Sequence, residues 1–293
     1  MKLYSTKHGI AREGEEGELA LLDIKASDLG ELLRSDPTLA SLKSAPMRRT
    51  LVLADTELMA PVQAPGCIYC IGANYESHVE EMATLNIGNS EAIQATLKKI
   101  RTTPMFFTVP ATATSAPHAD IVLPRFAPDM VDYEIEVAAV IGTGGSNIPV
   151  EQALAAVAGL TIANDVSARD LQKEAMTGTT LEFGHAKGLD GFKPMGPCLV
   201  SMDEFTDTMD CQIEARVNGE VRQRAKLGNL IHNIPTCVSY ISQYHTLRPG
   251  DVILTGSPAG VGFFQGKFLR AGDLVEMTAT GIGTIRNRVV ETA

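Results

Sequence analysis

Two glutamates stand two residues apart in the otherwise apolar stretch VDYEIEVAAVIG. Alternate side chains of a β-strand point to the same face, so we expect Glu134 and Glu136 to share one face. The opposite face then carries Tyr133, Ile135 and Val137, which serve the core. Two carboxylates this close repel each other, and their burial requires a cation or a proton between them. On an exposed face the pair would only be solvated, but the apolar flanks predict that this strand enters the core.

A third carboxylate ends the next apolar segment, GLTIAND. Asp165 stands at the end of this expected strand, just before a helix start at Ser167, and strand ends are common places for functional sites. Three carboxylates with water form a hard oxygen site that suits Mg²⁺, with Mn²⁺ or Ca²⁺ as substitutes. No histidine or cysteine stands nearby at a spacing typical of zinc sites. The residue types therefore predict a divalent-metal site.

Composition limits the classes of partner. The chain has 293 residues, 44% of them hydrophobic, and a formal net charge of −10, which argues against binding nucleic acid. No apolar run approaches the roughly 20 residues of a membrane span, and the amino terminus does not resemble a secretory signal. Five scattered cysteines favour a reducing, cytoplasmic location, and we interpret the Cys67 and Cys70 pair as structural rather than redox or metal-binding.

The pattern of short strands predicts an α+β fold that is mostly β. Residues 1–65 are expected to form a small N-terminal α/β domain, with strands at 2–6 and 19–24 and a helix at 26–35 capped by Ser27. A proline-marked linker at 58–66 leads to a domain at 66–293, in which strands dominate from Pro104 onward. Asn218 and Gly219 predict a type I′ hairpin. Helices are expected near 149–158, after Ser167 and near 230–244.

Six motifs in fixed order give the chain a family resemblance over residues 66–293. They are DYEIEVAAVIG, IANDVSARDLQ, KGLDGFKPMGPCLV, VNGEVRQ, TLRPGDVILTGSPAGVG and LRAGDLVEMTATGIGTIRN. Together they resemble the fumarylacetoacetate hydrolase family. This resemblance implies a β-rich domain of roll-like topology, a homodimer, and one Mg²⁺ or Mn²⁺ in each active site. It also implies a 2-oxo acid or its enol as substrate, which members hydrolyse at a carbon–carbon bond, decarboxylate or isomerise.

The resemblance also implies roles for individual residues around the metal. Position by position, it makes Glu134, Glu136 and Asp165 the metal ligands. Lys187, at the start of KGLD, resembles the lysine that stabilises enolate or oxyanion charge. His78 and Glu81, in GANYESHVEEM, match a pair that activates water in some members, where the glutamate orients the histidine as a general base.

Three further positions resemble residues that bind the substrate. Arg169 and Gln172, in ARDLQ, match residues that hold its polar head, and an arginine there can grip a carboxylate with two hydrogen bonds. Thr255, in TGSPAG, looks like the residue that closes the pocket over the substrate carboxylate.

The sequence also departs from the usual family pattern. Thr108 stands where a lysine often follows the Phe-Phe strand, Ser257 replaces a threonine in TGTPAG, and His185 precedes Lys187 by two residues. We interpret His185 as structural. The loss of one cation and the gain of a possible proton carrier bear on the choice of substrate.

The leading hypothesis is a metal-dependent hydrolase that cleaves a carbon–carbon bond of a 2,4-dioxo acid, of the fumarylpyruvate or acylpyruvate type found in catabolism of aromatic compounds or sugar acids. The alternatives on the same scaffold are a 2-oxoacid decarboxylase and an enol/keto isomerase of 2-hydroxy-dienedioates. A non-catalytic module that binds metal and carboxylates is a third, less favoured hypothesis.

Overall fold

The computed structural model describes residues 1–15, 17–84, 91–176, 184–205 and 210–292. Its strands are β1 Lys2–Thr6, β2 Gly9–Glu13, β3 Glu18–Leu22, β4 Met47–Val52, β5 Leu58–Met59, β6 Ile68–Gly72, β7 Met105–Val109, β8 Thr114–Ser115, β9 Ile121–Leu123, β10 Val131–Asp132, β11 Ile135–Ile141, β12 Val157–Asn164, β13 Ser167–Ala168, β14 Lys193–Ser201, β15 Gln212–Val217, β16 Glu220–Lys226, β17 Val252–Leu254, β18 Leu274–Ala279 and β19 Gly283–Glu291. Its α-helices are α1 Leu29–Leu33, α2 Glu76–Ala83, α3 Glu91–Ile100, α4 Val150–Ala153, α5 Arg169–Met176, α6 Gly184–Lys187, α7 Ile234–Ser242 and α8 Gly262–Gln265.

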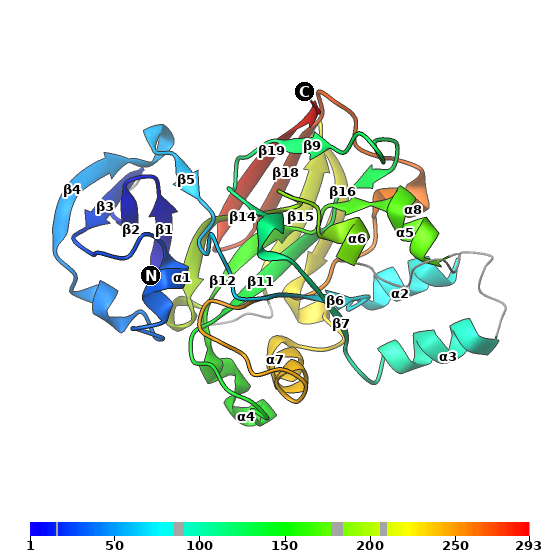
Figure 1. Cartoon of the computed structure of the whole chain (residues 1–293), viewed down its shortest axis with the longest axis horizontal. Helices are drawn as coiled ribbons and strands as arrows, with labels where there is room; N and C mark the ends of the chain where they lie inside the picture. Colours follow the sequence, from blue (N-terminus) through cyan, green and yellow to red (C-terminus); the bar gives the residue numbers. More distant parts are fainter. Residues whose placement is uncertain (16, 85–90, 177–183, 206–209, 293) are drawn as a thin grey trace.

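The strands of the described residues form one large sheet and two smaller ones (Figure 1). The 12-stranded sheet has the order β4-β3-β2-β1-β14-β12-β11-β17-β6-β7, and β5 and β8 pair at its side. A 5-stranded sheet has the order β16-β15-β18-β19-β9. Most pairs are antiparallel, and the parallel ones are β14 with β8, β17 with β6 and β19 with β9. The expected α+β, mostly β fold is therefore confirmed.

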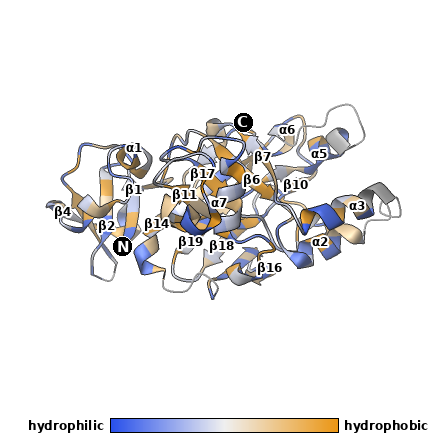
Figure 2. Ribbon diagram, turned by 90° about the horizontal axis from the view of Figure 1, so that it is seen from below, coloured by the Kyte–Doolittle hydropathy of each residue, from blue (hydrophilic) through white to orange (hydrophobic). Residues whose placement is uncertain are grey.

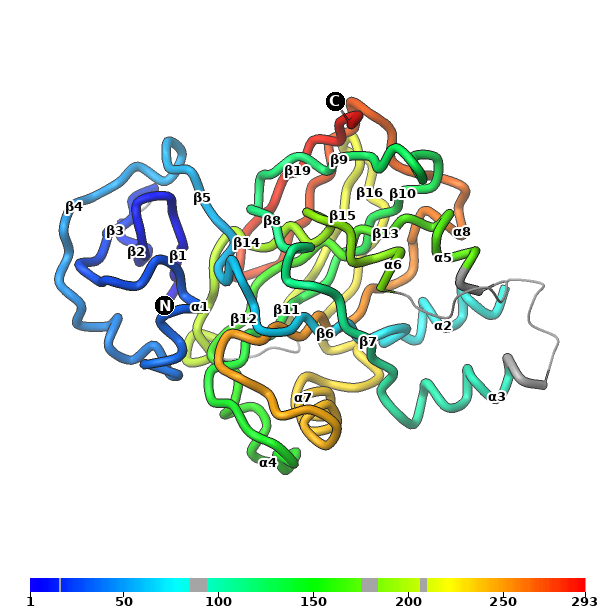
Figure 3. Tube along the Cα trace, in the orientation of Figure 1, coloured from blue at the N-terminus to red at the C-terminus, as the bar shows by residue number. Residues whose placement is uncertain are grey.

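Strands β1 to β4 extend the large sheet at one end of the molecule. β1 pairs antiparallel with β14, so that Leu3 lies opposite Leu199. Figures 1 and 3 show these strands on one side of the body, whereas α2 and α3 project from the other side. The division into domains at residue 65 stays a prediction, but the two parts share one continuous sheet.

The central strand β11 divides its side chains by parity, as the alternation predicted. Ile135 and Val137 belong to one buried hydrophobic cluster, which also includes side chains of the 5-stranded sheet. Ala138 and Val140 belong to a second cluster, which includes the N-terminal strands. Both faces of β11 are thus covered, and Figure 2 shows the hydrophobic residues gathered around the central strands. Glu134 and Glu136 share the parity of the second face, at the end of the strand that approaches the functional site.

One local expectation was wrong, and two others differ from the structure in detail. The cap of α1 is Asp28 rather than Ser27, because Asp28 Oδ1 accepts the Glu31 N–H at 2.7 Å while the Ser27 hydroxyl donates to the Glu31 carboxylate. The expected linker contains the short strand β5, which pairs with β1. The helix expected near 149–158 forms as α4 and continues as a 3₁₀ helix at Leu154–Ala156, but it ends there because Val157 begins the buried strand β12.

Other expectations at this level are confirmed. Asn218 and Gly219 have φ values of 52° and 79°, as a type I′ turn requires. α7 begins after Asn233, whose side chain accepts the Thr236 N–H at 3.0 Å. Among the residues that the structure describes, no helix combines the length and the apolar character needed to cross a bilayer.

The identity of the α1 cap gives a stability prediction. Asp28 also accepts the Gln63 N–H at 2.7 Å, so Asp28→Ala removes two hydrogen bonds and should lower the free energy of unfolding by about 1–2 kcal/mol. Ser27→Ala is the matched control and should cost less. Urea denaturation of the two variants measures the difference, and a larger loss for Ser27→Ala would contradict the assignment of the cap.

Candidate metal and active site

The three predicted carboxylates meet at one point. One carboxylate oxygen from each of Glu134, Glu136 and Asp165 lies within 4.8 Å of the others, and all three residues are buried. The antiparallel pairing of β11 with β12 brings them together, since Ile135 lies opposite Asn164. The Asp165 N–H then donates to the Glu134 carbonyl at 2.8 Å, which fixes the two backbones.

Two buried cations compensate part of this negative charge. The Lys187 ammonium donates to Glu134 Oε1 at 2.9 Å and also to Asp165 Oδ2. The Arg169 guanidinium donates to the same Glu134 Oε1 at 2.5 Å. Burial opposes the ionisation of Glu134, but Lys187 and Arg169 outweigh it and hold the pKa of Glu134 well below its ordinary value.

Among the residues that the structure describes, no cation forms an ion pair with Glu136. Its Oε2 accepts the Gly256 N–H at 2.6 Å, while burial and the charges of Asp165 and Glu134 raise its pKa well above the ordinary value. Gly256 has a φ of +97°, and a Cβ there would lie 2.7 Å from the Cβ of Asn74, so only glycine brings this N–H to the carboxylate. The charge of Lys187 favours ionised Glu136 but only partly offsets these effects, since the pKa stays raised.

The donor set fits a hard divalent cation. It consists only of carboxylate oxygens, and Asp165 Oδ1 is buried yet accepts no hydrogen bond. Such lone pairs are what Mg²⁺, Mn²⁺ or Ca²⁺ would use. We therefore regard Glu134, Glu136 and Asp165 as the residues that would hold the ion.

The cluster opens into a cavity of about 550 Å³. The polar part of its wall consists of His78, Thr108, Glu134, Glu136, Asp165, Arg169, Gln172, Lys187 and Ser257. The remainder is largely apolar and consists of Ile71, Gly72, Ala73, Met82, Met105, Phe106, Phe107 and Gly184. The cavity wall thus combines charged and apolar residues, which suits an organic acid of small size.

His78 and Glu81 are held next to each other on α2. His78 Nδ1 lies 3.1 Å from Glu81 Oε2, and Glu81 Oε1 accepts the Gly260 N–H at 3.1 Å. The histidine ring also packs edge-on against Phe264, with ring centroids 5.8 Å apart. When Nδ1 donates to Glu81, Nε2 carries the lone pair, so this residue of the cavity wall has the form of an oriented general base.

The expected substrate-binding residues differ in their placement. Arg169 Nη1 donates to Gln172 Oε1 at 2.6 Å, and both residues line the cavity. The Thr255 hydroxyl instead donates to the Val137 carbonyl at 2.8 Å, which ties its loop to β11. Ser257 of the same motif lines the cavity, and its hydroxyl accepts a hydrogen bond from Gln223 at 2.7 Å.

The sequence interpretation missed Asp132 and Lys193. Asp132 accepts hydrogen bonds from Arg169 Nε at 2.8 Å and from the N–H groups of Gly262 and Phe263 at 2.7 and 3.0 Å. Asp132 precedes Glu134 by two residues, and this alternation was the signal that could have placed it on the same face. Lys193 is fully buried, and its Nζ lies 2.8 Å from Asp165 Oδ1. It stands in the GFKP part of a quoted motif, but an isolated lysine gives no sign of burial.

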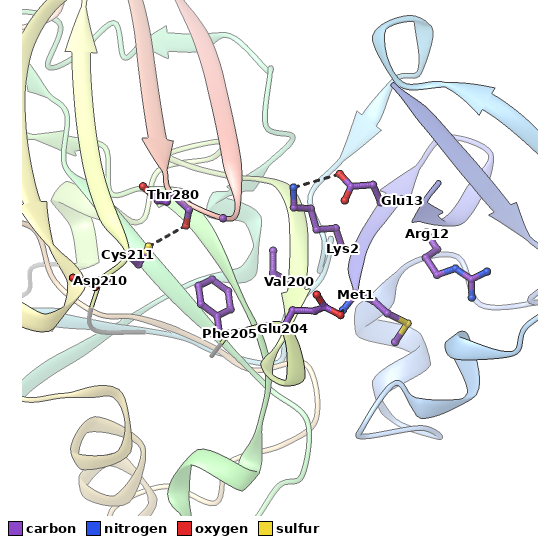
Figure 4. Close-up of a pocket in the computed structure, with 11 residues that line it drawn as sticks. Met1, Lys2, Arg12, Glu13, Val200, Glu204, Phe205, Asp210, Cys211 and Thr280 are labelled. Carbon is purple, nitrogen blue, oxygen red and sulfur yellow. Dashed lines mark hydrogen bonds and ion pairs between the residues drawn. The ribbon is translucent and has the colours of Figure 1, made fainter. Parts of the chain in front are cut away.

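A second cavity, of about 540 Å³, lies between the N-terminal strands and the body (Figure 4). Several of its charged groups are already paired. Lys2 contacts Glu13, and Arg12 donates to the carbonyls of Leu42 and Lys43. Asp210 forms an ion pair with Lys226 outside the cavity wall. Among the described residues, its wall has no cluster that resembles the carboxylate site.

Comparison with known proteins agrees with the geometry. The family model for the fumarylacetoacetate (FAA) hydrolase C-terminal domain matches residues 67–290. The chain is 40% identical over 242 residues to oxaloacetate tautomerase YisK of Bacillus subtilis, covering 81% of this chain and 74% of that protein. A solved structure of a putative HpcE protein from Mycobacterium smegmatis matches with a TM-score of 0.84 at 30% identity, covering 100% of both chains. The maleylpyruvate hydrolase of Sphingobium, solved with manganese(II) and pyruvate, matches with a TM-score of 0.77 at 25% identity, again covering 100% of both chains.

The carboxylate cluster leads to a prediction about cation binding. Glu136→Gln removes the carboxylate that has no cation of its own, so we expect binding of Mn²⁺ to weaken by more than about 100-fold in titration calorimetry. In EDTA the variant should unfold at the same temperature as the wild type or higher, because a buried repulsion is removed. The exposed Glu57→Gln is a control with the same change of charge. Unchanged Mn²⁺ binding in Glu136→Gln would exclude this cluster as the metal site.

Proposed function

This chain belongs to the fumarylacetoacetate hydrolase family, and from that premise we propose that it is a divalent-metal-dependent keto–enol tautomerase of a small 2-oxo acid of the oxaloacetate type. The similarity to the oxaloacetate tautomerase YisK supports this choice of reaction. The structural similarity to the 2-hydroxyhepta-2,4-diene-1,7-dioate isomerase of Mycobacterium marinum supports it as well, because that isomerisation also moves a proton next to an enol. Mg²⁺ or Mn²⁺ is the proposed cofactor.

One observation carries the proposal. A single cavity holds one oriented base, His78, together with a carboxylate cluster and the buried ammonium of Lys187. Tautomerisation requires only a base for the proton at C3 and positive charge at the 2-oxo oxygen. Hydrolysis would require, in addition, a place for the attacking water.

The residues of this chain divide the work as follows. A cation held by the three carboxylates would act as a Lewis acid on the 2-oxo group. His78 Nε2 accepts the proton from C3, and the electron pair of that C–H bond moves toward the 2-oxo oxygen. His78 then gives this proton to the 2-oxo oxygen, which completes the enol and restores the neutral base, and the reverse sequence regenerates the ketone. Glu81 holds His78 in the tautomer that this transfer needs.

Lys187 stabilises the developing charge and keeps its own proton. Burial would lower its pKa, but Asp165 and Glu134 raise that pKa above the ordinary value for lysine. Its ammonium is therefore a fixed positive charge rather than an acid. Such preorganised charge is worth most in a cavity that excludes water.

We assign the substrate carboxylate to Arg169, Gln172 and the Ser257 hydroxyl. The guanidinium of Arg169 has five N–H groups. Nε donates to Asp132, Nη1 to Gln172 and Nη2 to Glu134, so these contacts use three of the five. Thr255 then keeps the loop of Ser257 in place. A homodimer and a cytoplasmic location stay predictions that follow from the resemblance and the composition.

The second candidate is the acylpyruvate hydrolase that the sequence favoured. Its support is the Glu81-oriented His78, which could deprotonate water, and the hydrolase neighbour that holds manganese(II) and pyruvate. In that reaction water adds to the C4 carbonyl, the C3–C4 bond breaks, and its electron pair leaves with the enolate of pyruvate, which then takes a proton. Both candidates use the same base.

A paired assay separates the candidates. With Mn²⁺, the wild type should accelerate the decay of the ultraviolet absorbance of enol-oxaloacetate and release no pyruvate from acylpyruvates. His78→Ala should lower the tautomerase rate by roughly 10²–10⁴-fold. His8→Ala is the matched control, because this exposed histidine lies in the turn between β1 and β2 and does not line the cavity.

Two results would reject the tautomerase. One is a rate of enol decay no greater than that of Mn²⁺ alone. The other is a kcat/KM for pyruvate release from an acylpyruvate that exceeds the one for enol-oxaloacetate, which would assign the hydrolase instead.

A further inference from the structure

Lys193 is a buried cation beside the carboxylate cluster that has no role in the proposed proton transfer. It begins β14, and its side chain has no solvent exposure. Its ammonium donates to three backbone carbonyls, those of Val166 at 3.2 Å, Phe192 at 3.2 Å and Lys187. One side chain therefore joins the segment after Asp165 to the segment that carries Lys187.

An ion pair joins Lys193 to Asp165. Lys193 Nζ lies 2.8 Å from Asp165 Oδ1. An ammonium has three protons, and three backbone carbonyls also accept hydrogen bonds from this one, so the carboxylate shares Lys193 with the backbone. Lys193 thus attracts Asp165 and adds a positive charge next to an oxygen that a metal ion would use.

The charges of the described residues around the cluster nearly balance. The buried carboxylates are Asp132, Glu134, Glu136 and Asp165, and the buried cations are Arg169, Lys187 and Lys193. When all seven groups are ionised, one negative charge remains in excess. Without Lys193 the excess would be two, in a place where a low dielectric strengthens the repulsion.

We propose that Lys193 is a built-in counter-cation: it holds Asp165 and Lys187 in their working positions when no divalent ion is bound, and its charge weakens the binding of that ion. The inference rests on the divalent-cation part of the proposed function. It makes Lys193 a positioning residue, because it acts through Asp165 and Lys187 and does not line the cavity.

Removing the charge of Lys193 should have opposite effects on the stability of the metal-free protein and on its affinity for a divalent ion. This combination distinguishes the proposed role from a purely structural one. Loss of the charge should destabilise the metal-free protein, because the carboxylates then repel each other more strongly. The same loss should tighten binding of a divalent ion, because one competing positive charge has gone. A lysine that only supports the backbone would, when removed, weaken both the fold and the binding.

The test uses the full-length protein, Mn²⁺ as the probe, and three variants. Lys193→Met removes the charge and the hydrogen bonds, Lys193→Gln removes the charge but keeps two donors, and Lys193→Arg keeps the charge. Lys267→Met is an exposed control with the same change of net charge as the neutral variants. Thermal unfolding is followed in EDTA and in Mn²⁺, and the Kd for Mn²⁺ is measured by calorimetry.

We expect Lys193→Gln and Lys193→Met to unfold at lower temperatures than the wild type in EDTA. Mn²⁺ should raise their unfolding temperatures by more than it raises that of the wild type. Their Kd for Mn²⁺ should fall by about tenfold or more, since a unit charge near the ion interacts with both of its charges. Lys193→Arg and Lys267→Met should bind Mn²⁺ like the wild type. A neutral variant that folds only with Mn²⁺ also agrees with the proposal.

Weaker Mn²⁺ binding in Lys193→Gln than in the wild type would overturn the role of Lys193 and leave the proposed function intact. Failure of both neutral variants to fold even in saturating Mn²⁺ would likewise reduce Lys193 to a backbone support. A wild type that binds no Mn²⁺ would instead overturn both the proposed function and this inference.

Discussion

The burial of like charges at the end of β11 is the constraint on which the rest of the site depends. Glu134, Glu136 and Asp165 lie within 4.8 Å of one another in a place that water barely reaches. Carboxylates arranged in this way are unstable unless positive charge accompanies them. Lys187 and Arg169 supply part of that positive charge. The negative charge that they leave uncompensated attracts a divalent cation to this position.

The fold meets this constraint with ordinary elements. Antiparallel pairing of β11 with β12 sets Asp165 next to Glu134, and strand parity keeps the apolar side chains of β11 in the two cores. The TGSPAG loop then contributes the Gly256 N–H to Glu136. The same loop contributes the Gly260 N–H to Glu81, so the base and the carboxylates are positioned by one segment.

Much of this arrangement could be predicted from the sequence, for physical reasons. The period of two in DYEIEV placed Glu134 and Glu136 together, and the spacing of three between His78 and Glu81 brought them to one side of α2. Contacts between distant segments could not be predicted in this way. No local sequence pattern predicts that Lys193 lies beside Asp165. Nor does one predict that the Thr255 hydroxyl donates to the Val137 carbonyl of β11 while Ser257 lines the cavity. The cap of α1 was missed because Ser27 and Asp28 are both good caps, and the hydrogen bond that Asp28 also accepts from the Gln63 N–H is a contact between distant segments.

The central claim is that the three carboxylates hold one divalent cation in the wall of the cavity. Crystals grown with Mn²⁺ and measured at a wavelength where manganese scatters anomalously test this most directly. We predict one anomalous peak at roughly 2.0–2.4 Å from an oxygen of each of Glu134, Glu136 and Asp165. A fully ordered site without a peak, or a peak that contacts none of these three residues, would contradict the account.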